Sequence, residues 1–553
     1  MPSKIYPSQL IAPQNILDFD DLSWEAYTVY GSLQNDGPAS PYAVSAVLES
    51  LGYHDRYAQE HGYPNLFALS ERIVTLQAIY AHSHDSATAP PSERLTIFRN
   101  ILRGILYPLP WVINFALLFL IGLGLWGEST NSVPMATGTA LGIYSGIIFS
   151  SFWAQMAARR IPFFMSQHAQ HSKRQSINEL LLWGTASSIG LFSLLGFLLR
   201  ILGWFDVDTI ALLVRFGLIL AILQVVTSPL YSLRQLIRIT VAYLGGFVTL
   251  VGAALLGTHG HPDRLDIRQL VNMQIVSLVV TTVIMLFQSL WVTRTQSKGY
   301  QAMPMVQPRR RTVMRELLPY GLYGWFYFGL LFVDRFIVGT VFLQRTYPAG
   351  PLAAPTLVGY WPYVYPVTYE FIINWGLLVF VPILPAVFVA GEWVSTHMIP
   401  IMGDTHCKTS TAANVLFYRP FLILMAFSLL SVVIVGFIAQ RLAAQIPATA
   451  MDFPLYTEPM WLAVIAYGVL AVTLFLITFH FVFGRVGIVT WVTGLALIVD
   501  IGTGIGGSLM TGRPFAPLWG LAAGTGVLFV TLLISGLHMV HDFPAYYAAR
   551  DLL

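Results

Sequence analysis

The sequence predicts an all-α membrane protein with twelve transmembrane helices in two six-helix bundles. Three observations support this fold class: 56% of the 553 residues are hydrophobic, only 10% are charged, and long apolar stretches recur along most of the chain. Soluble domains contain about 25% charged residues, which argues against an ordinary soluble protein. The single cysteine, Cys407, excludes an intrachain disulfide and a metal site built from several cysteines.

Residues 1–95 precede the first apolar stretch and form a small acidic extension. Within 1–92, ten Asp and Glu stand against three Lys and Arg, a net charge of −7, so the rest of the chain carries about +10. Apolar residues at helical spacing in 42–54 and 73–82 predict a small helical unit. A loosely ordered acidic tail is an equally good interpretation. The extension lacks the apolar core of a signal peptide, so we expect it to stay cytoplasmic.

The remaining chain contains twelve stretches that meet the requirement of about 20 mainly apolar residues for a membrane span. They are 103–126, 133–157, 179–202, 206–228, 234–257, 270–293, 317–343, 363–391, 420–440, 458–483, 486–508 and 516–540. The longest interval between them, 294–316, is basic and separates six spans from six. The sequence therefore predicts a first bundle at 96–293, a linker at 294–316, a second bundle at 317–545 and a short tail at 546–553.

The distribution of Lys and Arg between the loops predicts the orientation. If the N-terminus is cytoplasmic, nineteen basic residues lie on the inner side and five on the outer side. Cytoplasmic loops carry the excess of Lys and Arg in membrane proteins. We therefore expect a multi-pass protein of the cytoplasmic (inner) membrane, surrounded by membrane lipids, with both termini inside.

Five charged residues interrupt the apolar helices at a similar predicted depth: Arg215, Asp334, Arg335, Glu370 and Asp500. Counting from the helix ends at 1.5 Å per residue places them about 10–13 Å below the outer surface. Charges that face lipid at this depth are costly, so we expect them to line a shared internal cavity, with Arg335 paired to Glu370. The alternative is a static network of ion pairs that only fixes the order of the helices.

Two prolines, Pro382 and Pro385, remove backbone donors from the predicted eighth helix and predict a kink there. Such a kink is either a gate or only a feature of the helix shape. No GxxxxGK[ST] stretch and no recognisable catalytic motif occurs in the sequence, so we expect neither an enzyme nor a nucleotide site. The His and Asp residues of 82–85 and 258–263 do not form complete ligand sets, so no metal is expected. The sequence also predicts no cofactor and no nucleic acid partner.

Three stretches together resemble the PelG-type exopolysaccharide exporters, which belong to the polysaccharide branch of the MOP flippase superfamily. PLPWVINFALLFLIG (108–122) is similar to the first helix of that family, and YGLYGWFYFGLLFVDRF (320–336) is similar to the seventh. YEFIINWGLLVFVPILPAVFVAGEW (369–393) is similar to the eighth, and ends at Glu392. Asp334, Arg335 and Glu392 match the family pattern. The acidic extension at residues 1–95 departs from this pattern.

The resemblance implies an exporter or flippase that moves a polysaccharide or a lipid-linked saccharide outward, between two bundles that rock about a polar cavity. It also implies a cytoplasmic glycosyltransferase and membrane proteins as partners. Trp325 and Tyr327 would then stack on sugar rings, or, in the simpler interpretation, only pack in the core.

Two other functions stay open. A small-molecule transporter of the major facilitator class is one, although loop 158–173 lacks its Gly-Asp-Arg motif; a non-transporting membrane scaffold is the other.

Overall fold

The computed structural model describes a helical protein over most of the chain. The described residues are 41–50, 54–60, 62–72, 101–121, 123–125, 127–128, 133–166, 170–258, 267–295, 310–342, 363–403, 414–443 and 457–541. Within them, eleven helices are long and apolar enough to cross a membrane, and a shorter apolar helix occupies the place of the predicted first span. The predicted all-α membrane fold is therefore confirmed. The described residues also contain one β-hairpin with two residues in each strand.

The described helices follow the predicted spans closely. In the first half they are α6 (Leu109–Ile121), α7 (Val133–Ser166), α8 (Gln170–Leu202), α9 (Val207–Ser232), α10 (Leu236–Thr258) and α11 (Ile267–Thr295). In the second half they are α12 (Arg310–Ile337) with its π-helical extension η3 (Val338–Phe342), α14 (Val367–Leu377), α15 (Phe380–Gly403), η4 (Asn414–Tyr418), α17 (Arg419–Ala443), α18 (Thr457–Val482), α19 (Val486–Thr511) and α20 (Ala516–His541).

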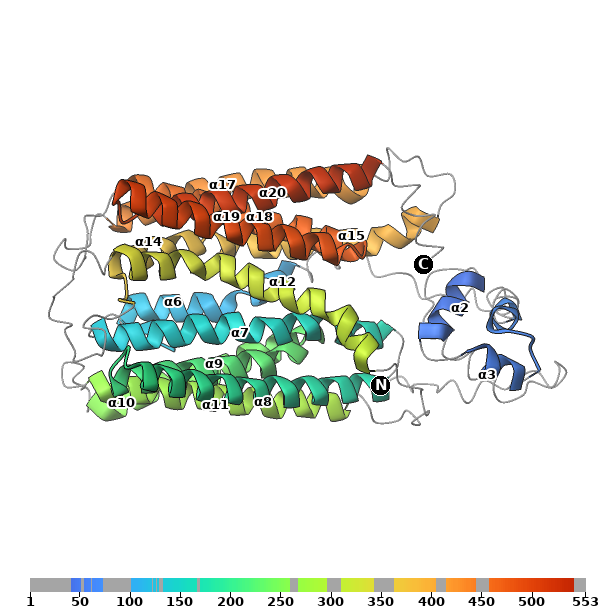
Figure 1. Ribbon diagram of the computed structural model, residues 1–553, viewed down its shortest axis with the longest axis horizontal. Helices are drawn as coiled ribbons and strands as arrows, with labels where there is room; N and C mark the ends of the chain where they lie inside the picture. The colour runs from blue at the N-terminus through green and yellow to red at the C-terminus, as the bar shows by residue number, and fades with distance from the viewer. Residues whose placement is uncertain are drawn as a thin grey trace.

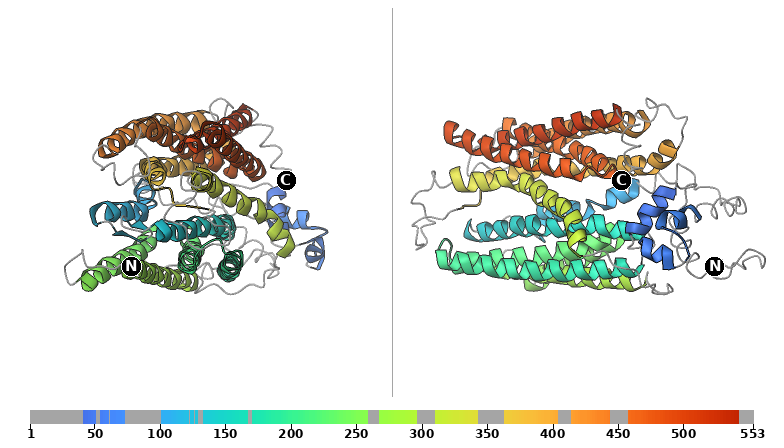
Figure 2. Two further views of the ribbon diagram at one scale, coloured as in Figure 1. Left: turned by 60° about the vertical axis from the view of Figure 1, so that its left-hand side comes forward. Right: turned by 45° about the vertical axis from the view of Figure 1, so that its right-hand side comes forward.

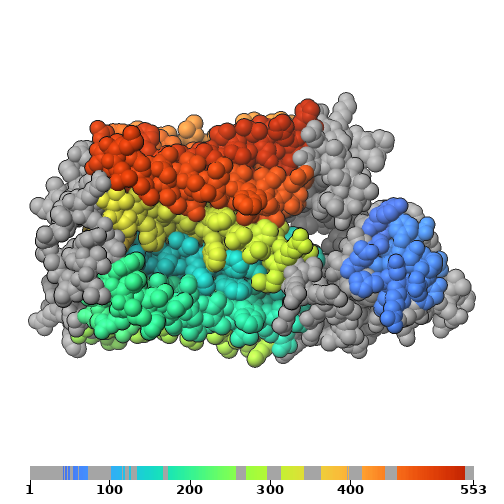
Figure 3. All heavy atoms as spheres, viewed as in Figure 1, coloured from blue at the N-terminus to red at the C-terminus, as the bar shows by residue number. Residues whose placement is uncertain are grey.

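The two halves form two layers, and α12 runs obliquely between them (Figures 1 and 2). In the space-filling view, α12 fills the seam between the first-half and second-half helices (Figure 3). It packs against α7 on one side and α19 on the other. We call the end of the molecule where α7 begins and α12 ends the distal end. The opposite end, beside α2 (Pro41–Ser50) and α3 (Asp55–Glu60) in Figure 1, is the proximal end.

The N-terminal extension is helical where the structure describes it. The helix predicted within 42–54 is present as α2, and a short second helix, α3, follows it. The helix predicted at 73–82 lies outside the described residues.

The first apolar stretch is not the single helix that the sequence predicts. A helix over 101–106 gives way to a turn at Tyr107 and Pro108, and α6 ends at Ile121, before the antiparallel strands β1 (Leu123–Gly124) and β2 (Gly127–Glu128). Pro108 has no backbone N–H to continue the first helix. The Asn114 side chain accepts a 2.6 Å hydrogen bond from the N–H of Leu125, which ties the hairpin back onto α6.

The predicted eighth span contains the expected interruption. It is divided into α14 and α15 by a turn at Leu378 and Val379, just before Pro382 and Pro385. The ring of a proline clashes with the carbonyl four residues earlier, which places the break ahead of the proline itself. Pro385 then packs closely on the first half, since a Cβ added to Gly104 would lie 2.6 Å from the Pro385 Cα. The interruption is therefore part of the seam between the two halves.

Candidate functional site

The pair of charges on α12 lies inside the protein. Asp334 and Arg335 come from the last turn of α12, and their exposed fractions are 0% and 1%. The Arg335 Nε donates to Glu370 Oε2 at 3.1 Å, so the predicted pairing of these two residues is present. Asp334 accepts a 3.0 Å hydrogen bond from the Tyr369 hydroxyl through Oδ2, and a 2.9 Å bond from the backbone N–H of Arg335 through Oδ1.

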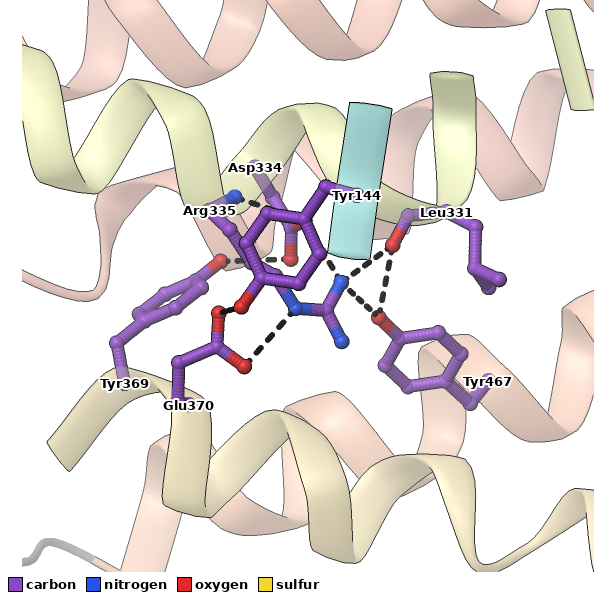
Figure 4. Close-up of polar contacts among 7 residues, drawn as sticks. All are labelled: Tyr144, Leu331, Asp334, Arg335, Tyr369, Glu370 and Tyr467. Carbon is purple, nitrogen blue, oxygen red and sulfur yellow. Dashed lines mark hydrogen bonds and ion pairs between the residues drawn. The ribbon is translucent and has the colours of Figure 1, made fainter. Parts of the chain in front are cut away.

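A residue from the first half completes this cluster. The hydroxyl of Tyr144, on α7, donates to Glu370 Oε1, and its ring lies 5.6 Å from the Arg335 guanidinium carbon (Figure 4). The ring also stacks on Phe332 of α12, with centroids 5.1 Å apart. Glu370 therefore uses one carboxylate oxygen within its own half and the other across the seam. We refer to Tyr144, Asp334, Arg335, Tyr369, Glu370 and Tyr467 as the seam cluster.

The remaining bonds of the guanidinium fix its position. Arg335 Nη1 donates to the carbonyl oxygen of Leu331, and the Tyr467 hydroxyl of α18 lies 3.5 Å from the same nitrogen (Figure 4). An ion pair buried this deeply is stable only when further hydrogen bonds satisfy the remaining polar atoms. The seam cluster meets that requirement with side chains from α7, α12, α14 and α18. In this conformation it is a packed network and does not line an open cavity.

Asp500, on α19, is also buried, with an exposed fraction of 0%. Neither of its carboxyl oxygens has a hydrogen-bond partner among the described residues. A Cβ added to Gly520 of α20 would lie 2.8 Å from Asp500 Oδ1, so this glycine closes over the carboxyl group. Asp500 is close enough to Asp334 for their charges to interact. Four of the five charged residues predicted to share a layer are therefore buried close to one another.

Arg215 is the exception, and its placement in the layer is corrected. Its side chain is exposed on α9, whereas the other four residues are buried. A depth count along the chain gives the height of a residue on its helix but not the face that it occupies, and the face of α9 at this position is turned outward. Without Arg215, the layer contains three acids and one base.

Trp325 and Tyr327 occupy different environments on α12. Trp325 is 37% exposed, and its indole Nε1 donates to the carbonyl oxygen of Phe149 on α7 at 3.2 Å. Tyr327 is 6% exposed and packs against Tyr323 and Phe328. The core-packing interpretation describes Tyr327 in this conformation, while Trp325 is a further contact across the seam.

Glu392 contributes a second polar link between the halves. Its Oε1 accepts from Arg234 Nη1 at 2.9 Å, and Arg234 belongs to the turn between α9 and α10 at the proximal end. The two side chains are 21% and 52% exposed. At the distal end, the backbone N–H of Tyr365 donates to Thr137 Oγ1 of α7 at 3.1 Å. Polar contacts thus join the halves at both ends of the seam.

Sequence reasoning missed Tyr144, Tyr369 and Tyr467. Each lies in an apolar stretch, and even Tyr369, which directly precedes Glu370, is indistinguishable from a core tyrosine on sequence alone. A depth count would not have found Tyr144, because eleven residues after the start of α7 at Val133 correspond to about 16 Å, deeper than the predicted layer. A carboxylate with two oxygens needs more than one donor, which would have directed the search to such residues.

Comparisons with known proteins identify the fold. No family model matches the chain, and no curated protein matches its sequence. Solved structures do match: a MATE transporter in complex with MaL6 has a TM-score of 0.55 at 14% identity, covering 81% of this chain and 96% of the other. The inward-facing conformation of a multidrug resistance MATE family transporter of the MOP superfamily has a TM-score of 0.52 at 13% identity, covering 81% and 95%.

A MOP superfamily transporter from Pyrococcus furiosus, described as having a binding pocket of reversed polarity, is similar to the same degree. Its TM-score is 0.53 at 13% identity, and the match covers 81% of this chain and 95% of the other. Identities this low are informative about the fold alone. The predicted MOP resemblance is therefore supported at the level of architecture: this chain has the fold of the MOP superfamily transporters.

Proposed function

We propose that this protein is a membrane exporter or flippase that moves a polysaccharide or a lipid-linked saccharide outward by alternating access. The observation that carries the proposal is the pair of polar contacts at opposite ends of one seam, Tyr144 with Glu370 and Arg234 with Glu392. Alternating access requires the halves to separate at one end while they join at the other. Polar contacts suit this, because water replaces the lost partner and the net cost of losing a hydrogen bond to a charged group is only about 1.5–3 kcal/mol.

In this proposal a proton gradient drives transport, and Asp500, which lies beside the seam cluster, is the group that takes up the proton. The layer holds Asp334, Glu370 and Asp500 against Arg335 alone, and both Asp500 oxygens are unpaired among the described residues. A buried carboxylate without a partner is costly, so the closed site favours the neutral acid. Separation of the halves would admit water, which stabilises the charged form. Proton exchange would then accompany each opening.

Saccharide as cargo rests on the resemblance of 108–122, 320–336 and 369–393 to PelG-type exporters. In this proposal the proximal end faces the cytoplasm of the cell, where a glycosyltransferase supplies the chain to be exported. Trp325, at the seam, would meet the sugar rings when the halves separate. The break before Pro382 and Pro385 would act as a hinge. It would let α14 and α15 move relative to each other when the halves separate at the proximal end.

Export from cells that synthesise the polymer tests the proposal. Cells carrying the chain with its glycosyltransferase are compared with cells carrying Glu370→Gln, and polymer is measured outside and inside. We expect the variant to lose most extracellular polymer and to retain polymer inside. Glu458→Gln is the matched control, because Glu458 is an exposed acid in the first turn of α18. Unchanged secretion by Glu370→Gln, at equal protein levels, would contradict the proposal.

Transport of a small molecule is the second candidate, since one of the similar structures is described as a multidrug resistance MATE family transporter. Accumulation of a fluorescent organic cation by cells separates the two candidates. If the chain lowers dye accumulation, and Glu370→Gln abolishes that effect without any change in polymer secretion, the small-molecule function replaces the saccharide one.

A further inference from the structure

A second site lies at the proximal part of the seam, away from the seam cluster. There α7, α8 and α12 enclose a cavity of about 300 Å³. This volume is at the lower end of the range of small-molecule sites, about 300–1,000 Å³. Two of its lining residues, Val313 and Met314, belong to α12, while the others belong to α7 and α8. The cavity is therefore shared by the two halves.

The polar side of this cavity contains both donors and acceptors. Arg160 Nη1 lies 3.1 Å from Glu179 Oε2, and Gln175 Nε2 donates to Glu179 Oε1 at 3.0 Å. Two buried polar atoms have no partner among the described residues: Arg160 Nε and the hydroxyl of Ser176, a residue that is 1% exposed. Buried polar atoms in proteins are nearly always hydrogen-bonded. Arg160 and Ser176 both line the cavity, so a small rotation of these side chains would let a polar ligand supply the missing partners.

The other side of the cavity is aromatic. Trp153, Phe164 and Trp183 line it, and Trp183 is 56% exposed at the rim. An indole offers a flat apolar face together with one N–H donor, a combination that suits ligands with one apolar and one polar side. Met314, 45% exposed, adds a second apolar side chain at the rim. An apolar chain attached to the ligand would run along these side chains.

The charged side chains that line the cavity indicate which kind of polar group it accepts. Arg160 alone would favour an anion such as a phosphate, but the Glu179 carboxylate already accepts from its guanidinium and would face the same anion. Like charges brought together at a binding site are costly. A hydroxyl-rich neutral headgroup avoids this cost, because hydroxyls both donate to Glu179 and accept from Arg160 and Ser176.

We infer that this cavity binds the headgroup of a neutral, hydroxyl-rich lipid, with the lipid chain leaving past Trp183 and Met314. The inference goes beyond the proposed export activity, because binding here requires no transport. Since the site is built from α7, α8 and α12 together, its occupancy stabilises the relative position of the two halves that the structure shows. A lipid bound here would therefore slow their separation at the proximal end.

A photoactivatable dodecyl glucoside tests the inference on the purified full-length chain in nanodiscs. A dodecyl phosphate with the same photoreactive chain serves as the matched probe, and labelled peptides are mapped by mass spectrometry. We expect the glucoside to label the 153–183 and 313–314 segments saturably, with unlabelled dodecyl glucoside as competitor. Trp183→Ala and Ser176→Phe should each reduce this labelling at least five-fold, while Leu198→Phe, an exposed position on the same helix, should leave it unchanged.

Three results would overturn the inference. The first is labelling spread evenly over the exposed helices, without competition. The second is labelling of the same segments by the phosphate probe at least as strongly as by the glucoside, which would indicate an anion site instead. The third is unchanged labelling in Trp183→Ala. Because Trp183 is largely exposed, this variant should fold even if the buried Ser176→Phe does not.

Discussion

Replacing Tyr144 with Phe removes a single hydroxyl from the seam and leaves the aromatic ring in place. The ring keeps its stacking on Phe332, so the loss is confined to the hydrogen bond to Glu370. A hydrogen bond to a charged group contributes about 1.5–3 kcal/mol. At about 1.4 kcal/mol per factor of ten, the ratio of separated to joined distal ends should rise roughly 10- to 150-fold.

The labelling rate of a buried cysteine measures this ratio. Thr137, on α7 at the distal end, is 0% exposed and bonds to the backbone of Tyr365 across the seam. Thr137→Cys in a Cys407→Ser background is treated with a bulky maleimide, with and without Tyr144→Phe. When opening is fast relative to labelling, the rate follows the open population, so it should rise by the same roughly 10- to 150-fold. Tyr323→Phe, which changes another buried tyrosine, is the control. A rate within two-fold of the parent would refute the reasoning.

Three further changes test other parts of the structure. Arg335→Met leaves the Glu370 carboxylate buried without its cation, so thermal unfolding in detergent should show a loss of about 3–5 kcal/mol; an unchanged unfolding temperature would show that the pair is dispensable. Arg234→Ala breaks a half-exposed pair, so its stability should stay within about 1 kcal/mol while the export rate changes. In Gly520→Ala the new Cβ would lie 2.6 Å from a backbone oxygen of α19. The unfolding temperature should therefore fall by the equivalent of about 1–3 kcal/mol, whereas Gly526→Ala, with no atom within 4 Å, should not lower it.

The helices could be predicted from the sequence because bilayer thickness fixes their length and hydropathy marks their position. The same count along each helix predicted that Asp334, Arg335, Glu370 and Asp500 lie close together, and all four are buried in the structure. The pairing of Arg335 with Glu370 followed from the tendency of consecutive helices to pack together. These inferences need only one coordinate, the distance along the helix axis.

The sequence alone does not determine how each helix is rotated about its own axis, or the contacts that depend on this rotation. Arg215 has a suitable height but lies on an exposed face of α9. Tyr144 completes the seam cluster from the other half, and no charge marks it in the sequence. The close contact of Gly142 with α9, where an added Cβ would lie 2.7 Å from the Leu213 carbonyl oxygen, is equally hidden. Such features depend on which faces meet, and pattern alone does not determine that.

The central claim is that the two halves move in opposite senses at the two ends of the seam. Double electron–electron resonance between spin labels measures this in nanodiscs, with Cys407→Ser as background. Exposed positions 207 and 510 report on the distal end, and exposed positions 237 and 488 report on the proximal end. We predict two populations at each end, with Tyr144→Phe lengthening the distal distance and shortening the proximal one. A single unchanged distance at both ends, in the parent, in Tyr144→Phe and in Arg234→Ala, would contradict alternating access and leave the seam cluster as a static network.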